Sequence, residues 1–264
     1  MDEPLEEKSH ITYSISGITG VKLKGVTHVN LLDKNLESVY VNESLNKVTI
    51  FIKDEVDFHQ ALKECERLIY QLLLSLILHK DAIVDIPQYN EEEKNQKSEN
   101  GDIITISSGI SIKSSLSITS IYDGEEFLEE MLNDRGMINP NNELLYRRLY
   151  SIMKNPDQVT KYLALYEFLL DLVSKGKPKK EQKNVTEFIK FKGFDKGMNS
   201  IPYHTTRRKN MNFKEDTFTY YRNEIAHAEF ENNFSKYEGL AGNINSKLIN
   251  RLIEVINCAI RHEV

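Results

Sequence analysis

Hydrophobic residues recur with two different periods along this chain, and the period changes near residue 123. Before that point, short segments alternate apolar and polar residues, as half-buried β-strands do. After it, apolar residues recur every three or four positions, as on one face of an α-helix. We therefore expect an α+β domain over residues 1–122 and an all-α antiparallel helical bundle over residues 123–264.

The first domain is expected to contain two groups of short strands and one long helix. Its strand segments are rich in β-branched and aromatic residues and cover residues 11–16, 21–24, 39–41 and 47–52, followed by 103–106, 110–112 and 116–119. The later group predicts a second hairpin. Between the groups, Asp54 is a candidate N-cap for a helix over residues 55–78. Residues 91–101 are polar and of low complexity, so we interpret them as a loop.

The second domain is expected to consist of helices with mostly short connections. Helical spacing of apolar residues is found in residues 125–134, 143–153, 159–174, 185–191, 213–230 and 245–262. The stretch between residues 192 and 212 contains Gly193, Gly197 and Pro202, and we interpret it as a loop. Short connections make neighbouring helices antiparallel, which favours a bundle.

Charge is distributed unevenly along the chain. The formal net charge is −6, yet residues 175–214 contain twelve Lys or Arg and only three acidic residues, so this window carries +9 and the rest of the chain −15. We call residues 175–214 the basic segment. A cationic segment on an acidic protein attracts polyanions to one face. A solvated loop that is rich in lysine by chance would give the same pattern.

The sequence favours a cytoplasmic protein without a membrane segment. Residues 1–7 are acidic and lack the basic and apolar order of a signal peptide. The most apolar run, residues 72–78, is far shorter than the roughly 20 residues of a membrane span. Cys65 and Cys258 lie far apart in apolar helical patterns, which predicts two buried thiols rather than a disulfide framework or a zinc site.

One polar grouping has the composition of a catalytic site. Residues 220–227 read Tyr-Tyr-Arg-Asn-Glu-Ile-Ala-His within the helix expected at 213–230. Histidine is a common acid and base in catalysis, which makes His227 a candidate for proton transfer, and Arg222 offers a planar cation that fits phosphate oxygens. Asn223 can orient an imidazole or contact a ribose or phosphate. Together these groups suit the cleavage of RNA by attack of its own 2′-hydroxyl, a route that requires no metal or other cofactor.

Helical geometry divides this motif between different faces. The apolar face that anchors the helix is formed by Phe218, Tyr221 and Ile225. Tyr220, Asn223 and His227 share another face, so we expect Asn223 and His227 to project together, outward or into an interface. Arg222 lies about 140° from His227 around the helix axis. The two residues can therefore share a site only through the long arginine side chain or through a second chain.

These residues resemble the signature of HEPN domains. Arg222 and Asn223 followed by His227 match the Arg-x4-6-His pattern in its Arg-Asn form, and residues 213–221 are similar to the acidic-Thr-aromatic approach of some members. The resemblance covers roughly the C-terminal half of the chain. It implies a homodimeric helical bundle in which two copies of the motif form a composite site that cuts RNA without a metal. It also implies a place in toxin, abortive-infection or other antiviral defence systems.

The resemblance also implies a role for each residue of the motif. His227 would act as acid and base, Arg222 would stabilise the phosphate in the transition state, and Asn223 would be the orienting partner. Substrate binding is expected from Tyr220 and from the basic segment, above all from Arg207, Arg208 and Lys209.

One position departs from a toxin subfamily that nucleotidyltransferase antitoxins modify. That subfamily carries a tyrosine two residues after the histidine, where this chain has Glu229. Control through that tyrosine is therefore not expected, and a regulatory partner is left unidentified. Glu224 and Glu229 also place negative charge near the motif, which the basic segment has to outweigh.

Two other interpretations stay open. A HEPN-like bundle can be a catalytically inactive module for dimerisation or for binding nucleotide or RNA, with residues 1–122 as a sensing domain. The motif helix can also belong to a plain interaction scaffold with a solvated polar face. Other enzyme classes are not indicated, because the sequence lacks a Gly-x-x-x-x-Gly-Lys phosphate loop, a Gly-x-Ser-x-Gly elbow and a His-Glu-x-x-His zinc helix.

Overall fold

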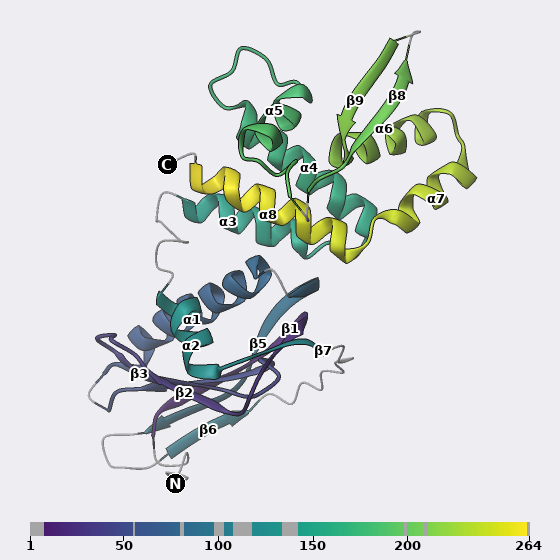
Figure 1. The fold of residues 1–264 in the computed structure, drawn as a ribbon. Helices are drawn as coiled ribbons and strands as arrows, with labels where there is room; N and C mark the ends of the chain where they lie inside the picture. Colours follow the sequence, from purple (N-terminus) through teal and green to yellow (C-terminus); the bar gives the residue numbers. More distant parts are fainter. Residues whose placement is uncertain are drawn as a thin grey trace. The chain divides into compact units, whose positions relative to one another are not determined.

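The chain folds into two compact units with mixed α+β structure, shown in Figure 1. Residues Met1–Pro140 form the first unit and residues Asn141–Val264 form the second. The structure is a computed structural model that describes residues 8–54, 56–79, 82–97, 103–107, 118–133, 142–197, 200–208 and 211–262. Within those ranges, no helix has both the length and the apolar content of a membrane span.

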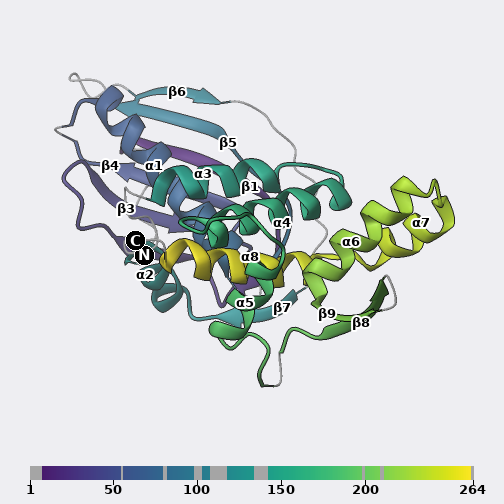
Figure 2. The ribbon, with the colours of Figure 1, turned by 90° about the horizontal axis from the view of Figure 1, so that it is seen from above.

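The first unit is built on a β-sheet to which seven described strands belong. They are β1 (His10–Leu23), β2 (Thr27–Asn30), β3 (Leu36–Val41), β4 (Lys47–Ile52), β5 (Ile83–Lys97), β6 (Ile103–Ser107) and β7 (Ile118–Tyr122). Six of them follow the order β2-β3-β4-β1-β5-β6 with antiparallel neighbours, and Figure 2 shows this order from β3 to β6. β7 instead runs parallel to the last residues of β1.

Alternation along β1 determines where the core of this unit lies. Ile11 and Tyr13 are buried and stand opposite Ile50 and Val48 of β4, so these four side chains share one face of the sheet. The helix α1 (Phe58–Leu78) packs against β1, β3, β4 and β5. Its buried residues include Ala61, Cys65, Ile69, Leu72 and Leu76.

A second helix extends the first unit beyond the predicted boundary. α2 (Gly124–Asn133) packs against α1 and β2, and both helices lie on the same face of the sheet (Figure 1). Ser75 Oγ of α1 donates a hydrogen bond to the carbonyl of Met131 in α2 at 3.3 Å. The first unit therefore continues to Pro140, whereas the change of period suggested that it ends at residue 122.

Three details of the first unit differ from the expectation. The N-cap of α1 is Asp57, whose Oδ1 accepts a hydrogen bond from the Gln60 amide at 2.9 Å, and not Asp54. Residues 91–97, predicted as a loop, continue β5, because β1 and β6 pair with both of its edges and satisfy its backbone groups. β6 pairs with β5, a pairing that the sequence did not predict. The segment predicted at 110–112 lies outside the described residues.

The second unit packs around α4 (Gln158–Ser174). Its other helices are α3 (Glu143–Met153), α5 (Lys183–Phe191), α6 (Thr217–Phe230), α7 (Phe234–Asn243) and α8 (Ser246–His262). α4 contacts α3, α5, α6 and α8, so a helix that is apolar around most of its circumference is buried by its neighbours. Its largest buried side chains are Tyr162, Tyr166, Lys161 and Phe168. The helices predicted at 143–153 and 159–174 are confirmed.

The prediction that the second unit is all-α is wrong. β8 (Tyr203–Arg208) and β9 (Met211–Asp216) form an antiparallel hairpin where the sequence predicted a loop and the first turn of the motif helix. Aromatic and β-branched residues at the start of β8 favour a strand, and Asp216 caps α6 so that this helix begins at Thr217. α7 was not predicted either, because Gly239, Gly242 and several polar residues weaken the helical periodicity of its sequence.

Tyr162 provides a test of how α4 holds α6. Its buried hydroxyl donates a hydrogen bond to the carbonyl of Phe218 at 2.6 Å, and burial raises the pKa of Tyr162 well above its ordinary value of 10.0. We expect Tyr162→Phe to lower the free energy of unfolding by about 1 kcal/mol, measured by urea denaturation. Tyr237→Phe in α7 is the matched control, because its less buried hydroxyl should contribute little.

The difference between Tyr162→Phe and the wild type should also depend on pH. Tyr162 ionises at its ordinary pKa only in the unfolded chain, so its contribution to stability is complete below pH 10.0 and is lost as the pH rises above that value. The wild type should therefore lose its advantage over Tyr162→Phe as the pH rises from about 10 to about 11. A difference that is constant over this range would contradict the assignment.

Candidate functional site

A buried carboxylate positions the helix that carries the candidate site. Asp216 is 0% exposed, and its Oδ1 accepts hydrogen bonds from the amides of Phe218 and Thr219 at 3.1 and 3.0 Å. Its Oδ2 accepts hydrogen bonds from the hydroxyls of Thr219 and Thr186 at 2.8 and 2.6 Å. Because Thr186 belongs to α5, this one side chain both caps α6 and joins it to α5.

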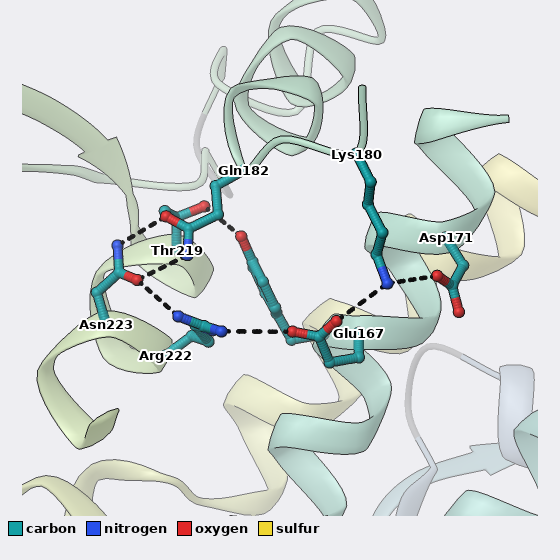
Figure 3. Close-up of polar contacts among 8 residues, drawn as sticks. Glu167, Asp171, Lys180, Gln182, Thr219, Arg222 and Asn223 are labelled. Atoms are coloured by element: carbon teal, nitrogen blue, oxygen red, sulfur yellow. Dashed lines mark hydrogen bonds and ion pairs between the residues drawn. The ribbon is translucent and has the colours of Figure 1, made fainter. Parts of the chain in front are cut away.

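The first turn of α6 is also fixed to α4. The Thr219 hydroxyl donates to Asp216, so it accepts from the hydroxyl of Tyr166, which lies 3.1 Å away (Figure 3). Tyr162 binds the carbonyl of the neighbouring residue, as described above. The start of α6 is thereby held from two sides, which fixes the position of the residues one turn later.

Asn223 is part of this buried support rather than of the exposed face. It is 4% exposed, and its Oδ1 accepts hydrogen bonds from Gln182 Nε2 at 2.8 Å and from Arg222 Nη1 at 3.2 Å. Its Nδ2 donates to Gln182 Oε1 at 3.0 Å and to Glu215 Oε1 at 3.1 Å. These contacts use both donors and both acceptor positions of the amide. The expectation that Asn223 projects outward together with His227 is therefore wrong.

Arg222 takes part in a chain of ion pairs that crosses from α6 to α4, as Figure 3 shows as far as Asp171, and continues to Arg148 of α3. The Nη2 of Arg222 lies 3.6 Å from Glu167 Oε1 in α4, and Glu167 Oε2 lies 3.2 Å from Lys180 Nζ. Lys180 also contacts Asp171 Oδ1 at 2.6 Å, and Asp171 Oδ2 accepts a hydrogen bond from Arg148 at 2.8 Å. Cations and carboxylates thus alternate along the surface of α4.

Lys180 and Asp171 are the most firmly paired members of this chain of ion pairs. The hydrogen bond to Asp171 raises the pKa of Lys180, and Glu167 adds to this effect. Burial alone would raise the pKa of Asp171, but hydrogen bonds from Lys180 and Arg148 outweigh it and leave the pKa below its ordinary value of 3.8. Lys180 is therefore a fully protonated cation that is held beside α4.

His227 lies on the exposed part of the same helix. Its side chain is exposed, as are those of Ala226 and Phe230, whereas Ile225 and Ala228 are buried. The guanidinium of Arg222 donates to Asn223 and lies beside Glu167 of α4. Asn223 and Glu167 therefore hold the guanidinium of Arg222, whereas the side chain of His227 is open to solvent.

The predicted substrate-binding residues divide into different groups. The ring of Tyr220 stacks on His204 of β8 with centroids 4.2 Å apart. The pKa of Tyr220 is raised, mainly by burial and also by the negative charge of Glu224. Glu224 in turn pairs with Lys236 of α7 at 2.9 Å. The backbones of Arg207 and Arg208 lie in β8, opposite Asn212 and Met211 of β9, and Lys209 lies outside the described residues.

Several cations of the basic segment are paired with nearby carboxylates. Lys177 lies 3.6 Å from Glu187, and Lys183 lies 2.9 Å from Glu181. The Lys192 ammonium lies over the ring of Phe191 at 4.8 Å from its centroid. These lysines are exposed or half-buried, so their partners can exchange with other anions at little cost.

Sequence reasoning missed the residues that hold the motif in place. Glu167, Lys180, Gln182 and Glu215 contact Arg222 or Asn223 or extend their network, but they come from other elements and lie 8 to 55 positions away in the sequence. Helical periodicity within α6 cannot reveal such partners. The position of Gln182 as N-cap of α5 gave no signal either, because glutamine is not a preferred capping residue.

Replacement of Asp216 tests whether it organises the site. We expect Asp216→Ala to lower the free energy of unfolding by about 2–4 kcal/mol, because it removes a helix cap and leaves two threonine hydroxyls without their acceptor. Asp157→Ala, which removes the exposed N-cap of α4 and one hydrogen bond from the Thr160 amide, should cost about 1 kcal/mol. Urea denaturation followed by far-ultraviolet circular dichroism measures both. Equal losses would contradict the organising role of Asp216.

Neither a metal-binding group among the described residues nor a similar known protein identifies the function of this site. Among the described residues, no group of three or more His, Cys, Asp or Glu side chains is arranged to hold a metal ion. Comparisons with protein-family models, with curated proteins and with solved structures gave no match. A function therefore has to be inferred from the residues and their geometry.

Proposed function

We propose that the chain is a HEPN-like endoribonuclease that cleaves RNA without a metal, at a composite site formed by two copies of α6. The observation that carries this proposal is the placement of Arg222. Its guanidinium is held by the fully hydrogen-bonded Asn223 on a fixed part of α6, while His227 is exposed on the same helix. A fixed cation and an exposed imidazole on one helix suit chemistry on a phosphodiester once a second copy brings them together.

The reaction follows from the chemistry of these groups. One His227 accepts the proton of the ribose 2′-hydroxyl, whose oxygen attacks the adjacent phosphorus. The bond from phosphorus to the 5′-oxygen breaks, and that oxygen receives a proton from a water molecule, to which His227 returns the proton that it accepted. Arg222 stabilises the charge that develops on the phosphate oxygens. The products are a 2′,3′-cyclic phosphate and a 5′-hydroxyl, and no metal is required because RNA supplies the nucleophile.

The role of Asn223 in this proposal is to position Arg222. Every hydrogen-bonding position of its amide is already used by Gln182, Glu215 and Arg222. It has no capacity left for a ribose or phosphate. Asn223 therefore acts through the arginine and does not itself contact RNA.

The exposed half of α6 supports the homodimer. Phe230 is 88% exposed and Phe234, just after the turn that leads into α7, is 77% exposed. Large apolar side chains beside an exposed His227 form a surface that a second copy can cover. Such a dimer also brings Arg222 of one copy near His227 of the other, which a single helix does not achieve by itself.

Charge supports RNA as the substrate. Residues 141–264 contain 21 Lys or Arg and 15 Asp or Glu, whereas residues 1–140 contain 13 and 25. The second unit is therefore positive while the first is strongly negative. A polyanion is attracted to the second unit with an affinity that falls as salt is added. We assign Tyr220, Arg207, Arg208 and Lys209 to substrate binding on this basis.

The biological setting proposed is a cytoplasmic defence or toxin-type system with a regulatory partner of unknown identity. It rests on the resemblance of the motif alone. The second candidate function is a catalytically inactive module that binds RNA or nucleotide. It is favoured by one observation, the neutralisation of Arg222 by Glu167 within the same chain. An assay of RNA cleavage decides between the two.

Loss of cleavage in two variants tests the enzymatic proposal. Arg222→Ala and His227→Ala should each reduce the cleavage rate at least about a hundredfold while leaving the dimer intact, because each removes a group that acts only in the transition state. Gel analysis of a labelled single-stranded RNA measures the rate, and size-exclusion chromatography with light scattering measures the dimer. Arg147→Ala and His262→Ala, at exposed residues of α3 and α8, are the matched controls. Unchanged cleavage by either motif variant would refute the assignment.

Mixing the two inactive variants tests whether the site is composite. A dimer that contains one Arg222→Ala chain and one His227→Ala chain keeps one site with both groups intact if the arginine and histidine come from different chains. After joint refolding, an equal mixture should recover about a quarter of the wild-type rate. No recovery, with exchange of chains verified by mass spectrometry, would show that Arg222 and His227 act within one chain.

A further inference from the structure

We propose that Arg222 and Lys180 form a binding seat for one phosphate of the RNA backbone, and that Glu167 occupies this seat in the free protein. The inference rests on the proposed function for the identity of the ligand. It adds Lys180 to the substrate-binding residues and gives the site a built-in competitor. The motif did not point to Lys180 or Glu167, because both residues lie outside α6.

Two cations from different elements converge on one carboxylate. Arg222 of α6 approaches Oε1 of Glu167 at 3.6 Å, and Lys180, which precedes α5, approaches Oε2 at 3.2 Å. Figure 3 shows the carboxylate of Glu167 between the two cations. The carboxylate thus marks a place where two positive charges meet at one surface, and a phosphate offers the same pair of acceptor oxygens.

Both cations are held in place by contacts that do not involve Glu167. Asn223 accepts a hydrogen bond from Arg222 Nη1, and Gln182 holds Asn223 in turn. Lys180 is held by Asp171 at 2.6 Å. If Glu167 turned away, the two cations would keep their positions. The seat is therefore preorganised, and its present occupant is exchangeable.

The contacts of Glu167 are weak enough for exchange. Arg222, Lys180 and Glu167 are all partly exposed, so water and solutes reach them. The distance between Arg222 and Glu167 exceeds that of a charge-assisted hydrogen bond, and partly exposed ion pairs contribute little to stability. RNA, in contrast, gains affinity at every phosphate through the release of condensed counterions. RNA can therefore displace Glu167, but Glu167 lowers the affinity for RNA by competing with it.

Removal of the competing charge tests the inference by binding alone. The ligand is a 2′-O-methyl oligoribonucleotide, which cannot attack its own phosphate and is not cleaved. Glu167→Gln should bind it about three- to tenfold more tightly than the wild type, in line with the loss of one weak competing ion pair. The slope of log Kd against log salt should rise by about 0.7, the value of one added phosphate contact on a single strand. Fluorescence anisotropy over a series of salt concentrations measures both.

Two variants separate the seat from a general effect of charge. Glu187→Gln removes an equally negative residue that pairs with Lys177 in the basic segment and does not contact Arg222, so it should tighten binding less than twofold. The double variant Glu167→Gln with Lys180→Gln should lose the gain, because one of the two cations of the seat is absent. Equal gains in Glu167→Gln and Glu187→Gln, or weaker binding by Glu167→Gln, would overturn the proposal.

The outcome is distinguishable from a failure of the proposed function. Cleavage of an unmodified RNA by the wild type is measured in parallel. Cleavage without a gain of binding in Glu167→Gln would refute the seat and leave the ribonuclease intact. A gain of binding without cleavage by the wild type would support the seat in a protein that binds RNA and does not cut it.

Discussion

The buried carboxylate of Asp216 is the contact on which the position of the candidate site depends. A carboxylate that is removed from water is stable only if hydrogen-bond donors replace the water. Asp216 finds four, two backbone amides at the start of α6 and two threonine hydroxyls from α5 and α6. Since these donors belong to both helices, satisfying the carboxylate requires α5 and α6 to meet at one geometry. Tyr166 and Tyr162 then add α4 to the same junction.

This constraint divides α6 into a supporting half and an exposed half. The first half carries polar residues that face its neighbours, ending with Asn223 and its four hydrogen bonds. The second half carries His227 and Phe230 toward solvent. A composite site between two copies requires a helix with a rigid first half and an exposed second half. The first half holds the catalytic groups in position, and the second half can contact the other copy. The proposed ribonuclease activity depends on this division of the helix.

The proposed binding of RNA near the motif implies an exchange of ionic partners rather than a simple addition of RNA to free cations. Lys180 and Arg222 already have carboxylate partners, and other lysines of the basic segment do as well. An RNA strand that binds there would replace internal anions by phosphates. Binding would then be weak at rest and strongly dependent on salt, and a change that moved Glu167 would raise affinity without creating any new cation. The positive charge of the basic segment alone does not reveal this competition.

The sequence by itself determined the period of several segments and therefore most of the helices, the strands β1, β3, β4 and β6 of the first unit, and the polar motif on α6. These features depend on residues close together in the chain, where spacing translates directly into a face. The tertiary structure decided which polar groups are used for support. Asn223 shares a helical face with His227 by spacing, yet it is buried because Gln182 and Glu215 supply the partners that its amide requires. The hairpin β8–β9 and the polar strand β5 likewise form because neighbouring strands satisfy their backbones. Such partners come from distant positions in the chain, and local periodicity carries no information about them.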